Sequence, residues 1–246
     1  MKSLVVLSVF LLLVGSGVAD KQTYGSGYEP KPPIPFPAQF KDYQILPDTI
    51  SPDQKLAFIY PKRSRLYELE KYNLFLGALT PFRTLSRIPL GNSNLSENAK
   101  GYYAASWSKD SGTAVFLVGS RWGPEKVWVL QLRDGKVAKT DLADAVRHQV
   151  LPDYKKSHAA RYNDYYDFVL DEENEDTSAW KLDDQGHVLI DTICTTDPKG
   201  FDPHGWTVRF KGTWDIAAEK FVEKSFSRIA PRPDQTLQPT TGRSDV

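Results

Sequence analysis

The chain has 246 residues and carries 31 basic and 31 acidic side chains, so its formal net charge at pH 7 is zero. Without a basic excess it lacks the charge that neutralises phosphates, and we expect no nucleic-acid partner. A single cysteine excludes an intramolecular disulfide, and the 12 Tyr, 12 Phe and 6 Trp residues favour β-strands.

The first residues have the three parts of a secretory signal peptide. Lys2 supplies the positive charge, a mainly apolar run follows over residues 4–14, and small residues end at Ala19. The apolar run is too short to cross about 30 Å of hydrocarbon, and no later stretch is long enough to do so. We therefore predict a cleaved signal peptide at residues 1–19 and a secreted or periplasmic mature chain without a transmembrane segment.

Proline dominates the next segment, residues 20–39, with five prolines between Pro30 and Pro37. Because proline fixes φ and removes an amide donor, this composition predicts an extended arm, acting either as a tether or as a ligand for an aromatic groove. At the other end, residues 231–246 are polar, which predicts a disordered tail. Residues 40–230 then form a single β-rich domain.

Alternation of apolar and polar residues predicts antiparallel strands across this domain. In residues 207–214, Val208, Phe210 and Trp214 point to one face and polar side chains to the other, as in a strand with one wet face. Residues 127–132 are apolar on both faces, which predicts a strand covered on both sides. Further strands are expected at residues 56–60, 73–79, 84–90, 102–107, 113–119, 136–141, 167–170, 187–191 and 221–229.

One helix is predicted in the middle of the domain. Asp141 can cap it, Asp144 lies in its first turn, and apolar residues from Leu142 to Val150 follow helical spacing. We expect Pro152 to end it. Because its apolar stripe is narrow, the helix is expected at the periphery of the β structure.

A polar turn that contains aspartate and precedes three strands occurs three times. The first turn spans residues 51–55, the second begins at Trp107 and contains Asp110, and the third begins at Trp180 and ends at Gly186. A unit of this kind cannot bury both of its faces alone, so neighbouring units must stack.

These turns resemble the Trp-Ser-Pro-Asp-Gly turn of TolB-type β-propeller repeats, which lies between the first two strands of a four-stranded blade. Residues 51–53, Trp107-Ser108 and Asp110 match parts of it. Gln54 stands where the repeat has glycine, Lys109 replaces the proline, and Ser111 displaces Gly112 by one place. We predict a mainly β, antiparallel fold of propeller-like stacked β units with one peripheral helix. The alternative is a β-sandwich or barrel whose hairpins use similar turns.

No sequence string typical of a hydrolase elbow, a zinc protease, a phosphate loop or a dinucleotide loop is present, and we expect no organic cofactor. The acid–base candidates are Asp202 and His204, in a loop that also contains Trp206. The two Asp-Pro steps and two glycines of this loop fit an ordinary turn equally well.

Seven acidic residues lie between Asp164 and Asp176 with no lysine or arginine among them. Oxygen ligands at this density are typical of a Ca²⁺ site, with Asp171, Glu173 and Asp176 as the candidate ligands, although a solvated charged loop has the same composition. Cys194 lies in a strand-like apolar run and is expected to be a small buried side chain.

The absence of catalytic strings and the propeller-like turns favour a secreted or periplasmic binding or interaction module with a protein or glycan partner, acting by surface contact. The alternative is an extracellular hydrolase acting on glycans, which needs two carboxyl groups about 5 to 10 Å apart. A purely structural component of the cell envelope is the third hypothesis.

Overall fold

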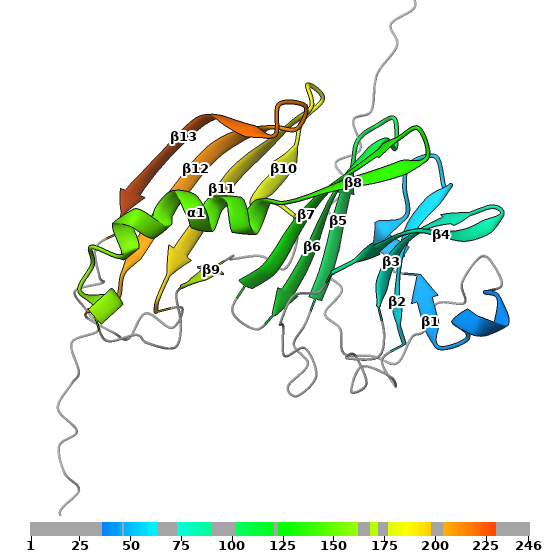
Figure 1. The fold of residues 1–246 in the computed structure, drawn as a ribbon, viewed down its shortest axis with the longest axis horizontal. Helices are drawn as coiled ribbons and strands as arrows, with labels where there is room; N and C mark the ends of the chain where they lie inside the picture. The colour runs from blue at the N-terminus through cyan, green and yellow to red at the C-terminus, as the bar shows by residue number, and fades with distance from the viewer. Residues whose placement is uncertain are drawn as a thin grey trace, which may run out of the picture. The chain divides into compact units, whose positions relative to one another are not determined.

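The computed structural model describes residues 36–45, 47–62, 73–89, 102–120, 123–161, 168–171, 177–197 and 204–229. All of them lie in one compact unit, Pro32–Val246. The predicted signal peptide, the predicted tail and most of the predicted arm fall outside these ranges. The described residues form three antiparallel sheets and one α-helix (Figure 1), which confirms the predicted mainly β class.

Sheet A contains the first four strands, paired in the order in which they follow one another along the chain. Both faces of its second strand are buried, because Phe58 points toward sheet B while Ile59 points to the outer face. The strands are β1 (Tyr43–Ile45), β2 (Leu56–Pro61), β3 (Leu74–Leu79) and β4 (Phe82–Ile88).

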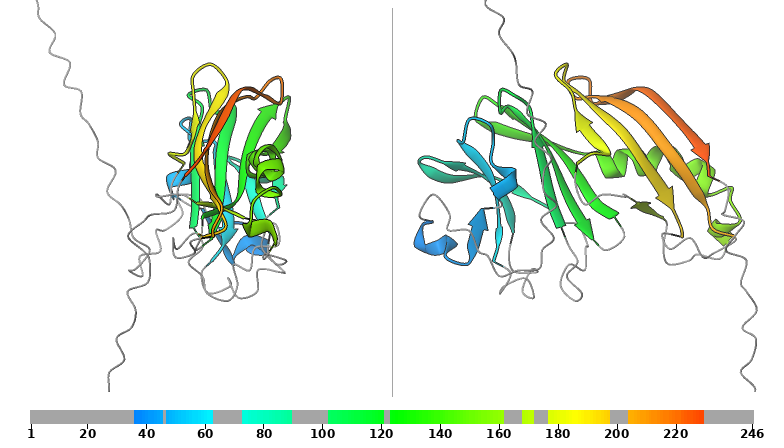
Figure 2. Two further views of the ribbon diagram at one scale, coloured as in Figure 1. Left: turned by 90° about the vertical axis from the view of Figure 1, so that its left-hand side faces the viewer. Right: turned by 180° about the vertical axis from the view of Figure 1, so that it is seen from behind.

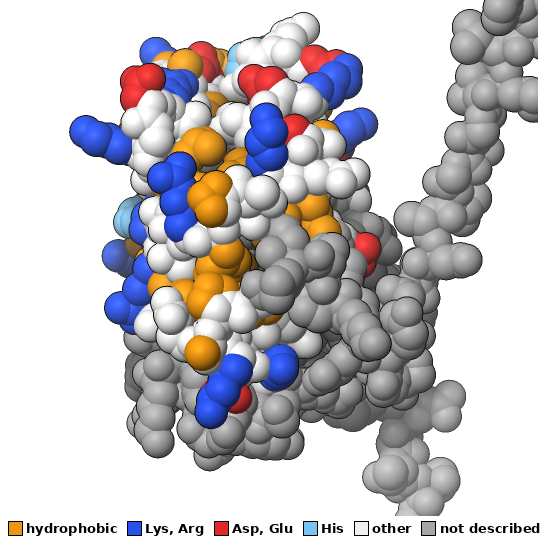
Figure 3. Space-filling model, turned by 90° about the vertical axis from the view of Figure 1, so that its right-hand side faces the viewer, with side chains coloured by type: hydrophobic (Ala, Val, Ile, Leu, Met, Phe, Trp, Pro, Cys, Tyr) orange, Lys and Arg blue, Asp and Glu red, His pale blue; other side chains and the backbone are white. Residues whose placement is uncertain are grey.

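The outer face of sheet A is covered by the segment that precedes it. Phe36 and Phe40, the latter in the short helix η1 (Ala38–Phe40), each lie 5.1 Å from Phe82 between ring centroids. Phe40 also packs edge-on against Tyr43 and Phe75. Figure 3 views the molecule from this side and shows a strip of apolar side chains flanked by Lys and Arg.

Sheet B contains the next four strands, again in chain order. Residues 114–119 of its second strand are all buried: Phe116 stacks on Phe58 of sheet A at 3.9 Å between centroids, and Leu117 points the other way. Burial of Val129 on one face and Leu130 on the other confirms the strand predicted to be covered on both sides. The strands are β5 (Tyr102–Trp107), β6 (Thr113–Ser120), β7 (Gly123–Arg133) and β8 (Lys136–Asp141).

Sheet C contains the remaining five strands and has one wet face. Val208 and Phe210 are buried while Arg209 and Lys211 are exposed, as the alternation predicted. The chain-order path is β10 (Trp180–Leu182), β11 (His187–Thr195), β12 (Thr207–Asp215) and β13 (Lys220–Arg228), and the short β9 (Val169–Asp171) also pairs with β11.

Helix α1 (Leu142–Tyr154) connects sheets B and C in the chain. Its N-terminus is capped as predicted, since Asp141 accepts a hydrogen bond from the backbone N–H of Asp144 at 3.3 Å. The predicted end at Pro152 is wrong. A proline in the last turn removes only its own donor, and the N–H of Lys155 still bonds to the Leu151 carbonyl at 3.0 Å, so the helix continues to Tyr154.

The sheets stack in their order along the chain. One apolar cluster joins sheets A and B, and a larger one joins sheet B, α1 and sheet C. Figure 2 shows the arrangement of the sheets from two further sides. Sheets A and B are open four-stranded meanders, sheet C is a four-stranded meander to which β9 is added beside β11, and none of the three closes into a barrel. Each unit begins one strand earlier than predicted. β1 ends before the first polar turn, β5 ends at the first residue of the second, and β10 occupies the first three residues of the predicted third turn.

Candidate interaction surface

The first polar turn is held by its own side chains. The Ser51 hydroxyl donates to the Asp53 carboxylate at 2.7 Å and accepts from the backbone N–H of Leu56 at 2.9 Å. The hydrogen bond from Ser51 is the main cause of a lowered pKa for Asp53. Gln54 has a φ of 58°, so a residue other than glycine occupies the left-handed conformation in this turn.

The second turn repeats this geometry 57 positions later, a spacing that places Ser108 and Ser111 where Ser51 and Gln54 lie in the first. Ser108 donates to Asp110 at 2.6 Å and accepts from the N–H of Thr113 at 2.9 Å. The residue in the left-handed conformation is Ser111, with a φ of 60°, and not the neighbouring Gly112.

The third turn is one residue shorter and replaces serine with aspartate. Asp183 accepts hydrogen bonds from the N–H groups of Gln185 and His187, both at 2.8 Å, and Gly186 has a φ of 86°. Burial disfavours the charged form of Asp183, but these bonds outweigh that effect and its pKa is lowered. The aspartates of the three turns therefore stabilise turns.

Contacts between the turns also tie one sheet to the next. The Ser111 hydroxyl accepts from the N–H of Asp53 at 3.2 Å, and Lys109 forms an ion pair with Asp184 of the third turn. The side chain of Trp107 donates to the Thr49 carbonyl at 3.0 Å. We interpret the row of turns as a structural seam between the units.

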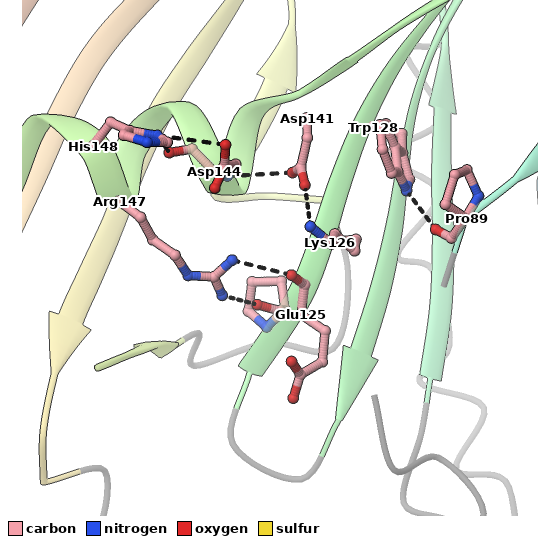
Figure 4. A network of polar contacts seen from close by, with 9 residues as sticks. Pro89, Glu125, Lys126, Trp128, Asp141, Asp144, Arg147 and His148 are labelled. Atoms are coloured by element: carbon pink, nitrogen blue, oxygen red, sulfur yellow. Dashed lines mark hydrogen bonds and ion pairs between the residues drawn. The ribbon is translucent and has the colours of Figure 1, made fainter. Parts of the chain in front are cut away.

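A second polar network holds α1 to sheet B (Figure 4). Lys126 pairs with Asp141 at 2.6 Å, and both side chains are mostly buried. Arg147 donates to the carbonyls of Pro124 and Glu125 at 3.4 and 3.2 Å. Because each of these polar groups has a partner, the network anchors the helix to β7.

The structure brings the predicted acid–base candidate His204 next to a residue that sequence reasoning did not select. Its ring lies 5.3 Å from that of His158 between centroids. Asp202 lies outside the described residues, so its pairing with His204, and with it the glycan-hydrolase alternative, stays a prediction. Trp206 is buried and packs against Tyr154 in the core.

The predicted calcium ligands fall mostly outside the described ranges. Asp171 is the last residue of β9, opposite Ile193 of β11, whereas Glu173 and Asp176 are not described. Within the described part of the chain, no group of three or more His, Cys, Asp or Glu side chains is placed to hold a metal ion.

Cys194 is fully buried, as predicted. Burial raises the pKa of its thiol to about 12, with a small opposing effect from Arg147. A thiol with this pKa is protonated at neutral pH and is therefore a poor nucleophile.

Exposed apolar side chains gather on the edge strand β13. Four large hydrophobic residues among those described are exposed, and three of them lie on this strand or directly after it. Their exposed fractions are 49% for Val222, 49% for Phe226 and 40% for Ile229, and the fourth residue is Leu189 at 42%, on β11, which β12 separates from β13. Figure 2 shows β13, in orange-red, at the outer edge of sheet C.

Cationic side chains flank this apolar edge. Lys224 donates to Gln149 of α1, and Arg228 pairs with Asp153 of α1 at 3.1 Å. Burial of the Asp153 carboxylate opposes its ionisation, but hydrogen bonds from Trp206 and Arg228 prevail and its pKa is lowered. We call residues 222–229, which include both of these cations, the β13 edge.

Searches of protein-family models, curated proteins and solved structures find no match to this chain. In the part of the chain that the structure describes, no helix is long and apolar enough to cross a membrane.

Proposed function

We propose that this chain is an exported interaction module that holds a partner by surface contact at the β13 edge. The observation that carries the proposal is the concentration of exposed apolar side chains on one long edge strand. Such an edge offers backbone N–H and C=O groups together with apolar surface, and native proteins normally blunt it unless a partner uses it.

The corresponding strands of the other sheets differ from β13. The exposed residues of β4 and β8 include Arg83, Arg87, Lys136 and Lys139, and no large exposed hydrophobic residue lies on either strand. These two edges also lie near each other, since the Lys139 side chain donates to the Arg87 carbonyl at 2.8 Å. Only β13 combines length, exposure and apolar side chains among the described edges.

Site-specific photo-crosslinking tests the proposal in the fluid that surrounds the producing cells. Phe226 is replaced by a photoreactive phenylalanine analogue, and Ala138, which is exposed on β8, serves as the matched control position. We expect a covalent adduct of defined mass from position 226 and none from position 138. Adducts of equal yield from both positions, or from neither, would contradict the proposal.

Export is tested separately by sequencing the N-terminus of the purified mature protein. Cleavage after Ala19 predicts a chain that begins at Asp20. A chain that retains Met1 after purification from the extracellular or periplasmic fraction would contradict the predicted signal peptide.

A further inference from the structure

We infer that β13 is the docking edge for an extended acidic peptide, which adds to sheet C as a further strand. This inference rests on the proposed function and specifies the mode of binding and the chemical class of the partner. It is carried by the backbone of β13, by the side chains on one of its faces and by the charge around it.

The backbone of β13 suits strand addition over a defined stretch. The strand pairs with β12 on one side, and none of the described strands pairs with it on the other. The register shifts between Thr213 and Trp214, opposite Val222, so the regular ladder runs from Glu223 to Arg228. Six residues are an ordinary strand length and are long enough to bind an added peptide by main-chain hydrogen bonds.

The side chains on the helix side of β13 determine which peptide fits. Lys224, Phe226 and Arg228 pair with consecutive inward-facing positions of β12, so all three lie on the same face of the sheet. An exposed aromatic ring therefore lies between two cations. A strand added to this edge places residues i, i+2 and i+4 opposite them, which favours an acidic, an apolar and an acidic side chain in that order.

The surrounding charge favours an acidic partner over a second copy of this chain. The strand carries Lys220, Lys224 and Arg228 against a single acid, Glu223, and Asp153 of α1, which pairs with Arg228, is a second acid close by. Lys156, just after α1, adds positive charge close enough to influence Asp153. A second β13 edge would bring the same cations to the same place, whereas acidic side chains complement them.

A synthetic peptide tests the inference on the intact mature protein. The probe is a blocked, fluorescently labelled heptapeptide, Thr-Glu-Thr-Val-Thr-Glu-Thr, and binding is measured by fluorescence anisotropy. Two matched peptides serve as controls: one has lysine in place of both glutamates, and the other has proline in place of the threonines at positions 3 and 5, which removes ladder donors. We expect saturable binding of the acidic peptide and at least tenfold weaker binding of both controls.

Hydrogen exchange and two variants locate the binding. The acidic peptide is expected to slow amide exchange within residues 223–228. Lys224→Glu should weaken binding about fivefold, the factor for one exposed ion pair, whereas the matched change Lys136→Glu on β8 should alter it less than twofold. Phe226→Ser removes the apolar contact without changing charge and should also weaken binding. Thermal unfolding confirms that each variant is folded.

Several results would overturn the inference. Equal binding of the proline peptide would show attraction by charge without strand addition, and equal effects of Lys224→Glu and Lys136→Glu would place the peptide elsewhere. If crosslinks form from position 226 but the acidic peptide does not bind, the partner class is wrong and the proposed function stands. If neither crosslinks nor peptide binding are seen, both fail.

Discussion

The outer face of sheet A carries Ile45 and Ile59 beneath the rings of Phe36 and Phe40, whereas the outer face of sheet C carries charged side chains that face solvent. On sheet C, Asp191 binds Arg209 at 2.6 and 2.9 Å. A stack of similar units must stop at both ends, as in repeat proteins, where terminal units carry a polar outer face. In this chain, aromatic side chains cover the end of the stack at sheet A, and a polar face forms the end at sheet C.

The largest loss of stability is expected from a change on the inner face of sheet C. Phe210→Ala removes a fully buried ring between sheet C and its neighbours, and we expect it to lower the free energy of unfolding by about 3 to 5 kcal/mol. The matched change Ser225→Ala on the outer face should cost less than about 0.5 kcal/mol. Chemical denaturation measures both, and equal losses would mean that the two faces are not distinct.

The aromatic cover of sheet A is tested by Phe40→Ala. Phe40 contacts three other aromatic rings but is only partly buried, so we expect a loss of about 2 kcal/mol. Phe226→Ala, which removes an exposed ring at the opposite end, is the control and should cost less than about 0.5 kcal/mol. A larger loss of stability from Phe226→Ala than from Phe40→Ala would mean that the covered end of the stack is at sheet C and not at sheet A.

The tie between α1 and β13 is tested by Asp153→Asn as a function of pH. Because the folded-state pKa of Asp153 is lowered, the carboxylate stabilises the protein above its unfolded-state pKa of about 4, and this contribution is lost as the pH falls through the folded-state value. We expect the variant to be about 1 kcal/mol less stable at pH 7, a figure reduced by the partial exposure of Arg228. In urea unfolding, the difference in stability between the variant and the unchanged protein should shrink as the pH is lowered from 5 to 2.5. A difference that does not change with pH would exclude an ionic origin.

The smallest effect is expected at the polar face of sheet C. Asp191→Asn removes an exposed ion-pair network with Arg209 and Lys211, and should cost about 0.5 kcal/mol or less. Added salt should reduce the loss of stability caused by Asp191→Asn, since salt screens exposed ion pairs. Unfolding at about 0.05 and 0.5 M NaCl tests this, and a salt-independent loss above about 2 kcal/mol would show that the face is not simply solvated.

Local patterns in the sequence predicted much of the fold. Alternation located β12 and its two faces, and the recurring polar turns located the start of the second strand in every sheet. The first strands of sheets A and C escaped detection because β1 and β10 have three residues each, too few to show a period of two. Periodicity also gave no sign that Gln54 and Ser111 would adopt left-handed conformations without glycine.

The candidate surface was harder to predict than the strands that form it. The sequence identified a strand at residues 221–229, but exposure of Phe226 depends on which strand lies beyond it, a tertiary property. The approach of His158 to His204 joins positions 46 residues apart through the packing of α1 on sheet C, and no local pattern encodes it. Asp202 and the acids after Asp171 remain predictions.

The order of the sheets has a consequence for how the chain reaches its native state. Each sheet is made from consecutive strands, and each packs on the sheet that precedes it in sequence. Most strand pairings therefore close short loops, which keeps contact order low for a β protein and favours fast folding. During synthesis, which starts at the N-terminus, sheet A can form before the residues of sheet B are available. Assembly can therefore proceed from sheet A to sheet C, with sheet C and its open edge formed last.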